Sequence, residues 1–171
     1  STKLNIMSKA KKFSKHITWK EATGSATAKK LDIDNTPNDD QLSNMKILAE
    51  ELFEPLRERV GEPILVNSFF RCEKLNQAIS GSATTSQHIQ GCAIDLDATK
   101  MKNCELFYII KNEFDYDKLI WEYGDDTNPD WIHVSYVKGK NRKLVYQAKR
   151  KPGKGYSTYT HFDLDIVQED E

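Results

Sequence analysis

The sequence lacks the cysteine pattern of disulfide-bonded secreted domains and the long apolar runs of membrane-spanning segments. Its three cysteines are odd in number and show no C-x-x-C spacing, which argues against a disulfide framework and against a cysteine zinc site. We expect Cys92 to be a buried thiol. No apolar run reaches about 18 residues, so no membrane span is expected. No apolar stretch follows the N-terminal lysines, so no signal peptide is visible and we expect synthesis in the cytoplasm.

The chain also lacks a strong net charge. Its formal net charge is -1, so the total gives no pull toward nucleic acid or anionic lipid, and no nucleic-acid partner is predicted. The stretch from Lys138 to Lys154 is nevertheless basic, and the last residues, 168–171, are acidic. A solvated surface with a frayed terminus explains both runs. The alternative is a basic rim that attracts an anionic polymer.

The length of 171 residues suits one domain, which would bury about two-thirds of the surface that the unfolded chain exposes. We therefore expect a single domain over residues 1–171, and a monomer. Residues 1–15 are polar and basic, and we expect them to form a loose arm.

The strongest helix signal lies between Leu42 and Val60, where apolar residues recur at steps of three and four. This spacing gives one apolar stripe on an α-helix. Asp39 or Asp40 can cap its start, and Gly61 can end it in the left-handed conformation. Pro55 should kink the helix, because it lacks an amide hydrogen and its ring crowds the preceding turn.

Thr18 and Glu21 fit a capping box that opens a short helix, and a further helix is expected over Met101–Asn112. Short segments rich in β-branched and aromatic residues predict strands. These segments are Pro63–Phe70, Cys92–Asp97, Lys118–Tyr123, Trp131–Val137 and Lys143–Ala148.

Turn residues at 124–129 and at 139–141 separate the last three predicted strands and indicate hairpins. Helices come first and a strand meander follows. This order predicts an α+β fold with a mainly antiparallel sheet and helices packed on one face.

Three residues carry the chemistry: His88, Asp95 and His133. The first two stand in Ser86-Gln-His-Ile-Gln-Gly-Cys-Ala-Ile-Asp95, and the third ends Asp130-Trp-Ile-His133. Two imidazoles and one carboxylate leave a tetrahedral zinc ion one open position, which water can fill. A nearby unligated carboxylate would then serve proton transfer, so the set indicates a zinc-dependent hydrolase.

Strand periodicity predicts how these ligands meet. In the 92–97 strand, Asp95 faces away from Ile94 and Leu96, and in the 131–137 strand His133 faces away from Ile132 and Val134. If the two strands are neighbours, Asp95 and His133 share one polar face. Considered alone, His133 could be a partly buried histidine that makes an ordinary hydrogen bond. Asp95 is harder to explain without a partner, because burying an unpaired carboxylate costs free energy.

His88 and Asp130 need turns to reach that face. His88 lies seven residues before Asp95, an odd step, so a bulge or turn at Gly91 must return it to the metal side. Asp130 is also an odd step from His133, and a turn at the strand entry could swing it toward the metal. General base is the preferred role of Asp130, and direct coordination is the alternative. His16 and His161 lack such neighbours and are expected at the surface.

At these residues the chain resembles the zinc D-Ala-D-Ala carboxypeptidase and L-alanyl-D-glutamate endopeptidase family, which carries S-x-H-x-x-G-x-A-x-D and a later D/E-x-x-H. The resemblance covers roughly residues 16–138, and nothing is recognised from 139 to 171. Further similar segments include those typical of the small bacterial and phage branch. They are Thr23–Ala28, Asn35–Pro37, Leu52–Arg57 and Val66–Arg71 with Leu75, Asn76 and Gly81.

The resemblance implies the α+β fold shared with the hedgehog signalling domain, and Zn2+ as the cofactor. It implies that His88, Asp95 and His133 bind zinc, that Asp130 is the base and that Arg71 stabilises the oxyanion. A guanidinium fits that last role because it offers two aligned donors and a permanent charge. The alternative for Arg71 is a salt bridge with Glu73 or another surface acid. Ser86 would hold a substrate carboxylate or brace the site.

The expected function is hydrolysis of peptidoglycan stem peptides, at a terminal D-Ala or at L-Ala-D-Glu. The enzyme would act at the bacterial cell wall, delivered by a phage or released. One alternative is a non-catalytic zinc module of the same fold, for example in a phage particle. Another is a zinc amidase or peptidase that acts on a non-wall peptide.

Overall fold

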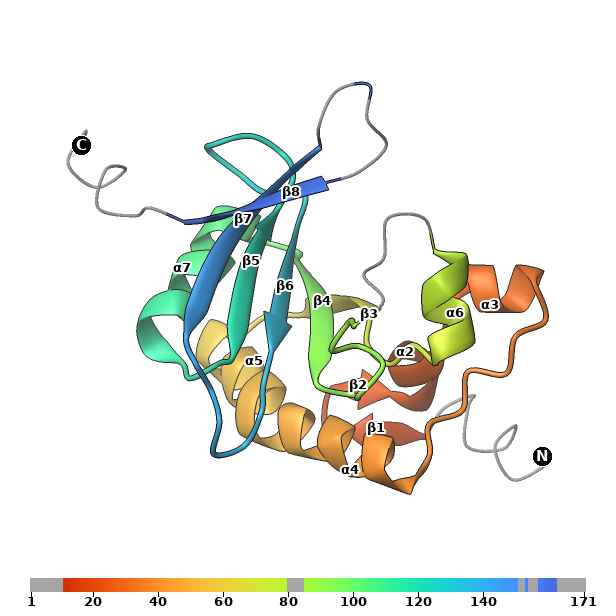
Figure 1. The fold of residues 1–171 in the computed structure, drawn as a ribbon. Coiled ribbons are helices and arrows are strands. Elements are labelled where there is room, and N and C mark those ends of the chain that lie inside the picture. Colours follow the sequence, from red (N-terminus) through yellow and green to blue (C-terminus); the bar gives the residue numbers. More distant parts are fainter. Residues whose placement is uncertain (1–10, 80–84, 151–152, 154–156, 163–171) are drawn as a thin grey trace.

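The fold is built on one six-stranded sheet with strand order β3-β4-β6-β5-β7-β8 (Figure 1). It is seen in a computed structural model that describes residues 11–79, 85–150, 153 and 157–162. The strands of the sheet are β3 (Ile64–Ser68), β4 (Ala93–Ala98), β5 (Lys118–Glu122), β6 (Trp131–Ser135), β7 (Leu144–Arg150) and β8 (Ser157–His161). The first five correspond to the predicted strands, whereas β8 was not predicted.

The N-terminal elements form a small layer of their own beside β3 (Figure 1). Strands β1 (Lys12–Ser14) and β2 (Ile17–Thr18) pair with each other, and helices α2 (Trp19–Thr23) and α3 (Ala26–Lys30) follow. The Thr18–Glu21 capping box is confirmed. The loose arm expected over residues 1–15 is wrong for residues 12–14, because the Phe13 side chain is buried in the core and anchors β1. Residues 1–10 of that arm lie outside the described part.

The long predicted helix is present in three segments: α4 (Asp39–Leu48), the π-helical η1 (Ala49–Phe53) and α5 (Glu54–Val60). The N-cap is Asn38, whose side chain accepts a hydrogen bond from Gln41 N, and not Asp39 or Asp40. The wider π turns precede Pro55, where an α-helical hydrogen bond cannot form because proline has no amide hydrogen. Gly61 ends the helix with a φ of 74°, as expected.

Two helices lie between the strands. Helix α6 (Glu73–Ala78) follows β3, and α7 (Asn103–Glu113) follows β4 close to the predicted position. No helix of the described residues is long and apolar enough to cross a membrane. The three cysteines are free thiols, and Cys92 is buried as expected.

The sheet is mixed, which corrects the expectation of a mainly antiparallel sheet. Strand β7 pairs with β5 in parallel, whereas β6 lies between β4 and β5. The 139–141 hairpin is therefore wrong. Strand β6 already pairs with β4 on one edge and with β5 on the other. Strand β7 therefore pairs with the remaining edge of β5. Because β7 runs opposite to β6, it runs parallel to β5.

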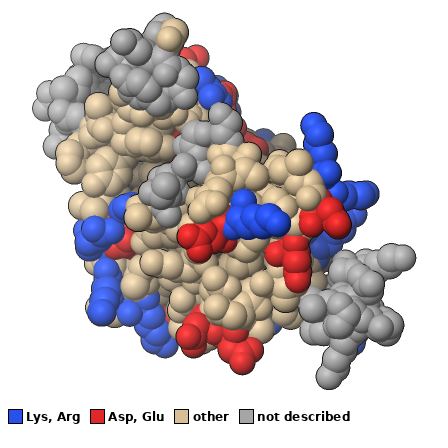
Figure 2. All heavy atoms as spheres, turned by 45° about the vertical axis from the view of Figure 1, so that its right-hand side comes forward, with Lys and Arg blue, Asp and Glu red and all other residues tan. Residues whose placement is uncertain are grey.

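One face of the sheet builds the hydrophobic core. Ile94, Leu96, Ile132 and Val134 are fully buried there, together with Leu119 and Trp121 from β5 and apolar residues of α4, η1, α5 and α7. Helices thus cover this face. The opposite face carries polar residues and faces a cavity. On the surface shown in Figure 2, Lys and Arg side chains alternate with Asp and Glu in small groups.

Gly91 closes the turn that leads into β4, and its conformation suits only glycine. Its φ is +76°, and a Cβ atom there would lie 2.4 Å from the carbonyl oxygen of Gln41 and 2.8 Å from Cγ of Met45. The turn is also tied to α4 by hydrogen bonds from Gln41 Nε2 to Ile89 O and from Asn44 Nδ2 to Gln90 O.

We predict that Gly91→Ala lowers the free energy of unfolding by several kcal/mol, roughly 1–2 from the left-handed backbone and about 1–3 from the forced contact. Gly139→Ala is the matched control, because Gly139 has the same φ of +76° but nothing within 4 Å of a Cβ. Urea denaturation of both variants measures the difference. Equal losses would show that close packing against α4 contributes nothing at Gly91.

Candidate metal centre and catalytic cavity

The centre of the site is a pair of residues on neighbouring strands. Asp95 of β4 and His133 of β6 are direct partners in the antiparallel register, as the periodicity predicts for adjacent strands. Nδ1 of His133 lies 3.1 Å from Oδ1 of Asp95. Both side chains are largely removed from solvent, with 12% and 13% exposure. The polar face of the sheet therefore presents an imidazole and a carboxylate side by side.

His88 reaches this pair from the turn before β4, as required by the odd spacing to Asp95. Its Nδ1 lies 2.7 Å from the carbonyl oxygen of Phe69. A carbonyl only accepts hydrogen bonds, so Nδ1 carries the proton and Nε2 presents a lone pair. The His88 and His133 rings approach edge to face with centroids 5.1 Å apart.

The arrangement of acceptors indicates a cation site. Nε2 of His88 is buried without a hydrogen-bond partner and lies 3.3 Å from Oδ2 of Asp95. Two acceptor atoms at this separation repel unless a proton or a metal ion lies between them. Ligand atoms of His88, Asp95 and His133 all lie within 4.8 Å of one another. Two imidazole nitrogens and one carboxylate oxygen are the donors that zinc prefers.

The electrostatics of Asp95 agree with this reading. Burial opposes ionisation of the carboxyl, but positive charge on the imidazoles of His88 and His133, and hydrogen bonds from them, outweigh it and hold the pKa of Asp95 well below its usual range. Where Nε2 of His88 is unprotonated, a bound cation would supply that positive charge instead. Asp95 is therefore an anion in the folded protein, ready to bind a cation.

A cavity opens directly over the three residues. Its walls come from the 85–88 turn, from the polar face of β5 and β6, and from β7 and β8. Besides the three clustered residues, the cavity is lined by polar and aromatic side chains, among them Arg71, Ser86, Lys118, Glu122, Tyr123, Tyr146, Arg150 and Tyr159.

Glu122 is the site residue that the sequence reasoning missed. It lies on β5, which pairs with β6 so that Ile120 is opposite His133 and Glu122 is opposite Trp131. Glu122 is thus diagonal to His133 on the same face. Its side chain lines the cavity and is only 6% exposed. Burial raises the pKa of Glu122 to about 7, and the negative charge of Asp95 adds to this while His133 opposes it.

Asp130 is not brought into the cavity. It lies one residue before β6, where strand alternation points it away from His133, and it is exposed in a separate hollow. Its backbone is fixed from two sides: Asp130 N donates to Glu122 O at 2.9 Å, and Asn103 Nδ2 donates to Asp130 O at 3.1 Å. The turn that would swing it toward the metal does not form.

Arg71 lies in the cavity wall and is held there by the chain around it. Asn35 donates from Nδ2 to Phe70 O and accepts from Cys72 N, so one buried amide clamps both neighbours of Arg71. Burial lowers the pKa of Arg71, and the carboxylates of Asp95 and Glu122 oppose this effect. No salt bridge to Glu73 is found among the described residues. The guanidinium therefore faces the anionic side of the cavity.

Ser86 braces the turn that carries His88. Its Oγ accepts a hydrogen bond from His88 N at 3.3 Å, and Ser86 also lines the cavity. The segment expected to contain Gly81 lies outside the described residues.

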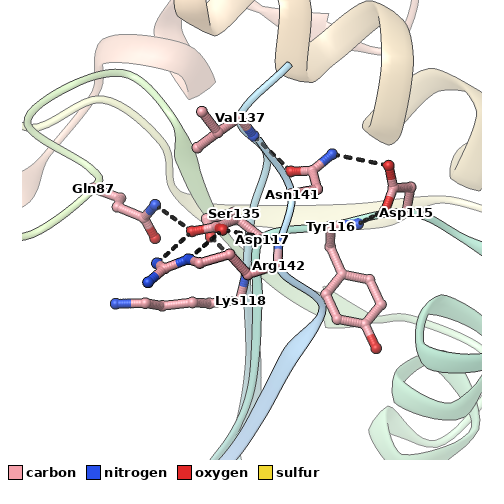
Figure 3. A network of polar contacts seen from close by, with 9 residues as sticks. All are labelled: Gln87, Asp115, Tyr116, Asp117, Lys118, Ser135, Val137, Asn141 and Arg142. Atoms are coloured by element: carbon pink, nitrogen blue, oxygen red, sulfur yellow. Dashed lines mark hydrogen bonds and ion pairs between the residues drawn. The ribbon is translucent and has the colours of Figure 1, made fainter. Parts of the chain in front are cut away.

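A buried carboxylate joins this turn to the sheet (Figure 3). Asp117, just before β5, accepts from Gln87 Nε2 at 2.8 Å and from Nε and Nη2 of Arg142 at 2.8 and 2.9 Å. Figure 3 shows Gln87 and Arg142 converging on the same carboxylate. Gln87 is the residue before His88, so this network helps to hold the metal turn. The Arg142 guanidinium, aided by Gln87, holds the pKa of Asp117 at about 2.

The fold and the site together define a metallopeptidase-type hydrolase: an α+β domain with a His-Asp-His cluster at the floor of a cavity. The comparison with family models agrees. The model for Peptidase M15 matches residues 15–135, and the chain belongs to this family. The family is zinc-dependent. No curated protein matches the chain significantly in sequence.

We predict that Asp117→Asn destabilises the protein in a pH-dependent way. Because the folded pKa of Asp117 is depressed to about 2, its contribution is complete above the unfolded pKa of about 4 and is lost as pH falls from 4 toward 2. At neutral pH the loss should be about 1–2 kcal/mol, since Arg142 is partly exposed and solvent weakens the pair.

Urea denaturation between pH 2 and pH 7 measures this effect, with Asp115→Asn as the control. Asp115 is exposed, and its carboxylate accepts hydrogen bonds from two neutral donors, Tyr116 N and Asn141 Nδ2. A difference between wild type and Asp117→Asn that persists unchanged to pH 2 would contradict the assigned charge interaction.

Proposed function

We propose that the protein is a zinc-dependent peptidase that hydrolyses peptidoglycan stem peptides containing D-residues. The observation that carries this proposal is the cavity in which possible ligand atoms of His88, Asp95 and His133 converge beside Glu122 and Arg71. A purely structural zinc site usually has a fourth protein ligand. His88, Asp95 and His133 would supply only three protein ligands to a zinc ion, and all three line the cavity.

His88 Nε2, a carboxylate oxygen of Asp95 and His133 Nδ1 would hold the ion. When bound, zinc supplies Lewis acidity that polarises a carbonyl and acidifies water. Phe69 O fixes the tautomer of His88 through Nδ1, which keeps Nε2 available as a ligand.

Proton transfer is assigned to Glu122, and not to Asp130 as the motif alone indicated. Glu122 lines the cavity, and burial raises its pKa to about 7. A pKa near neutral pH suits a group that both takes and returns a proton. In this role its carboxylate accepts a proton from the attacking water and later donates it to the leaving amine. Arg71 stabilises the negative charge that develops on the carbonyl oxygen.

The substrate class follows from the family resemblance of the Ser86–Asp95 motif. Cleavage at a terminal D-Ala or at L-Ala-D-Glu would both fit a peptidase of this kind. The enzyme would then act at the bacterial cell wall, delivered by a phage or released.

Zinc should bind with one ion per chain and stabilise the fold. At a zinc concentration about 100 times its Kd, we expect the free energy of unfolding to rise by about 2.7 kcal/mol. His133→Ala should abolish the zinc-induced rise in Tm, whereas His161→Ala, an exposed histidine on β8, should keep it. Thermal denaturation with and without zinc measures both. An undiminished rise for His133→Ala would remove His133 from the ligand set.

Glu122→Gln should lower kcat on stem peptides by about 10²- to 10⁴-fold, the usual contribution of a general base. It should leave zinc binding intact. Asp130→Asn should retain activity close to the wild type. Product formation read by mass spectrometry, alongside zinc titration, distinguishes the two carboxylates. The reverse result would return the role of base to Asp130.

The competing function is a zinc-binding module without catalysis. It predicts one bound zinc per chain but no product from any stem peptide. It also predicts that Glu122→Gln changes neither zinc affinity nor any turnover. Digestion of purified stem peptides by the zinc-loaded protein decides between the two.

A further inference from the structure

The cavity has a wall that comes from outside the family match. Strands β7 and β8 lie beyond residue 135, where the match to the family model ends, yet Tyr146, Arg150 and Tyr159 line the cavity. In Figure 1 the two strands continue the sheet past β5. The part of the chain that showed no resemblance therefore completes the site.

The sheet register explains why these side chains point into the cavity. Tyr146 of β7 is opposite Ile120, which is opposite His133. In the next row, Ala148 is opposite Glu122 on one side and Tyr159 on the other. Side chains in one row share a face of the sheet. Tyr159 therefore lies two strand spacings, about 10 Å, from Glu122 across a small alanine, a distance suited to a neighbouring residue of a bound peptide.

Arg150 brings a positive charge to the cavity, where it also attracts the carboxylate of Glu122. Its guanidinium lies 4.1 Å from the centre of the Tyr123 ring, which holds it in place. Among the described residues Arg150 forms no ion pair, whereas the adjacent Lys149 lies 3.5 Å from Asp126. An unpaired guanidinium in a concave surface is suited to a carboxylate, which it can bind through two parallel hydrogen bonds.

The overall charge of the cavity supports an anionic ligand. Arg71, Lys118 and Arg150 line it, against the carboxylates of Asp95 and Glu122. The carboxylate of Asp95 already contacts the imidazoles of His88 and His133. Its negative charge therefore offsets little of the positive charge of the cavity. Tyr159 adds an apolar surface to the cavity, because its large aromatic side chain is 51% exposed. An exposed aromatic ring beside a free guanidinium can contact both the apolar and the anionic parts of a peptide.

Resting on the proposed peptidase function, we propose that the β7–β8 wall selects the substrate. Arg150 binds a carboxylate of the peptide away from the scissile bond, and Tyr159 packs against the residue that carries it. Two sources share this chemistry: the C-terminal carboxylate of the peptide, and the free α-carboxylate of a γ-linked D-glutamyl residue.

The test uses a synthetic stem pentapeptide with γ-linked D-Glu and a D-Ala-D-Ala terminus. In two further peptides the C-terminal carboxylate or the D-glutamyl carboxylate is replaced by an amide. For the wild type, kcat/KM should fall about 10- to 100-fold on one of the two amides, which names the carboxylate that is bound. Arg150→Gln should lose a similar factor on the all-acid peptide, mainly through KM, and should no longer distinguish acid from amide.

Lys149→Gln is the matched control, because it removes the same charge from the neighbouring residue on the other face of β7. It should keep the wild-type preference for the acid peptide, and Tm values should show that both variants fold. The proposal is overturned if Arg150→Gln retains the preference, or if it lowers kcat/KM equally on acid and amide peptides.

A binding measurement separates this proposal from the peptidase function. Calorimetric titration of zinc-loaded Glu122→Gln with the acid and amide peptides should show tighter binding of the acid, and adding Arg150→Gln should remove the difference. If the wild type cuts none of the peptides but this binding preference is present, the wall is supported and the peptidase function fails. If peptides are cut without any carboxylate preference, the wall fails and the peptidase function stands.

Discussion

The site depends on the register between β4 and β6. Asp95 and His133 are opposite each other because Ile94 pairs with Val134 and Leu96 with Ile132. All four of these apolar side chains are fully buried. A slip of one residue would turn them toward the cavity and bury a carboxylate and an imidazole in the core. The hydrophobic energy of the core therefore fixes the positions of two of the three residues in the His-Asp-His cluster.

The third ligand depends on a turn, and the turn depends on glycine and on α4. Gly91 adopts a φ of +76° and lies against the backbone of Gln41. Side chains of α4 hold the same turn through the carbonyls of Ile89 and Gln90, while Asp117 holds it from the opposite side through Gln87. His88 is thus placed by contacts with two layers of the fold. Its own tautomer is set by a third contact, at Phe69 O.

The features that the sequence predicts correctly are those that depend on residues close together in the chain. Alternation within a strand is local, so it assigned Asp95 and His133 to one face. The order of strands is not local. The turn residues at 139–141 indicate a hairpin, but they carry no information that β6 already has two neighbours. Strand β8 gave little signal because Ser157–His161 is mostly polar and partly exposed.

The two candidate carboxylates, Asp130 and Glu122, illustrate the same difference. Asp130 was chosen because it stands three residues before His133, but sequence distance along β6 places it on the wrong side. Glu122 lies on β5, the strand next to β6, and follows no spacing within the motif. The alternation of Leu119 and Trp121 into the core does leave Glu122 on the polar face. Together with the β5–β6 pairing that the turn residues at 124–129 already predict, this alternation is a signal that could have identified Glu122.

The parallel pairing of β7 with β5 has a consequence for the shape of the site. It carries the row of Ile120 and Tyr146 across to the strands beyond the family match, so the cavity face is extended without disturbing the metal ligands. Zinc ligation tolerates little change because the three donors must converge. The cavity-lining residues Tyr146, Arg150 and Tyr159 lie outside the β4–β6 pairing, although Val145 of β7 packs against the core. Changes at these three residues would therefore leave in place the register that positions Asp95 and His133.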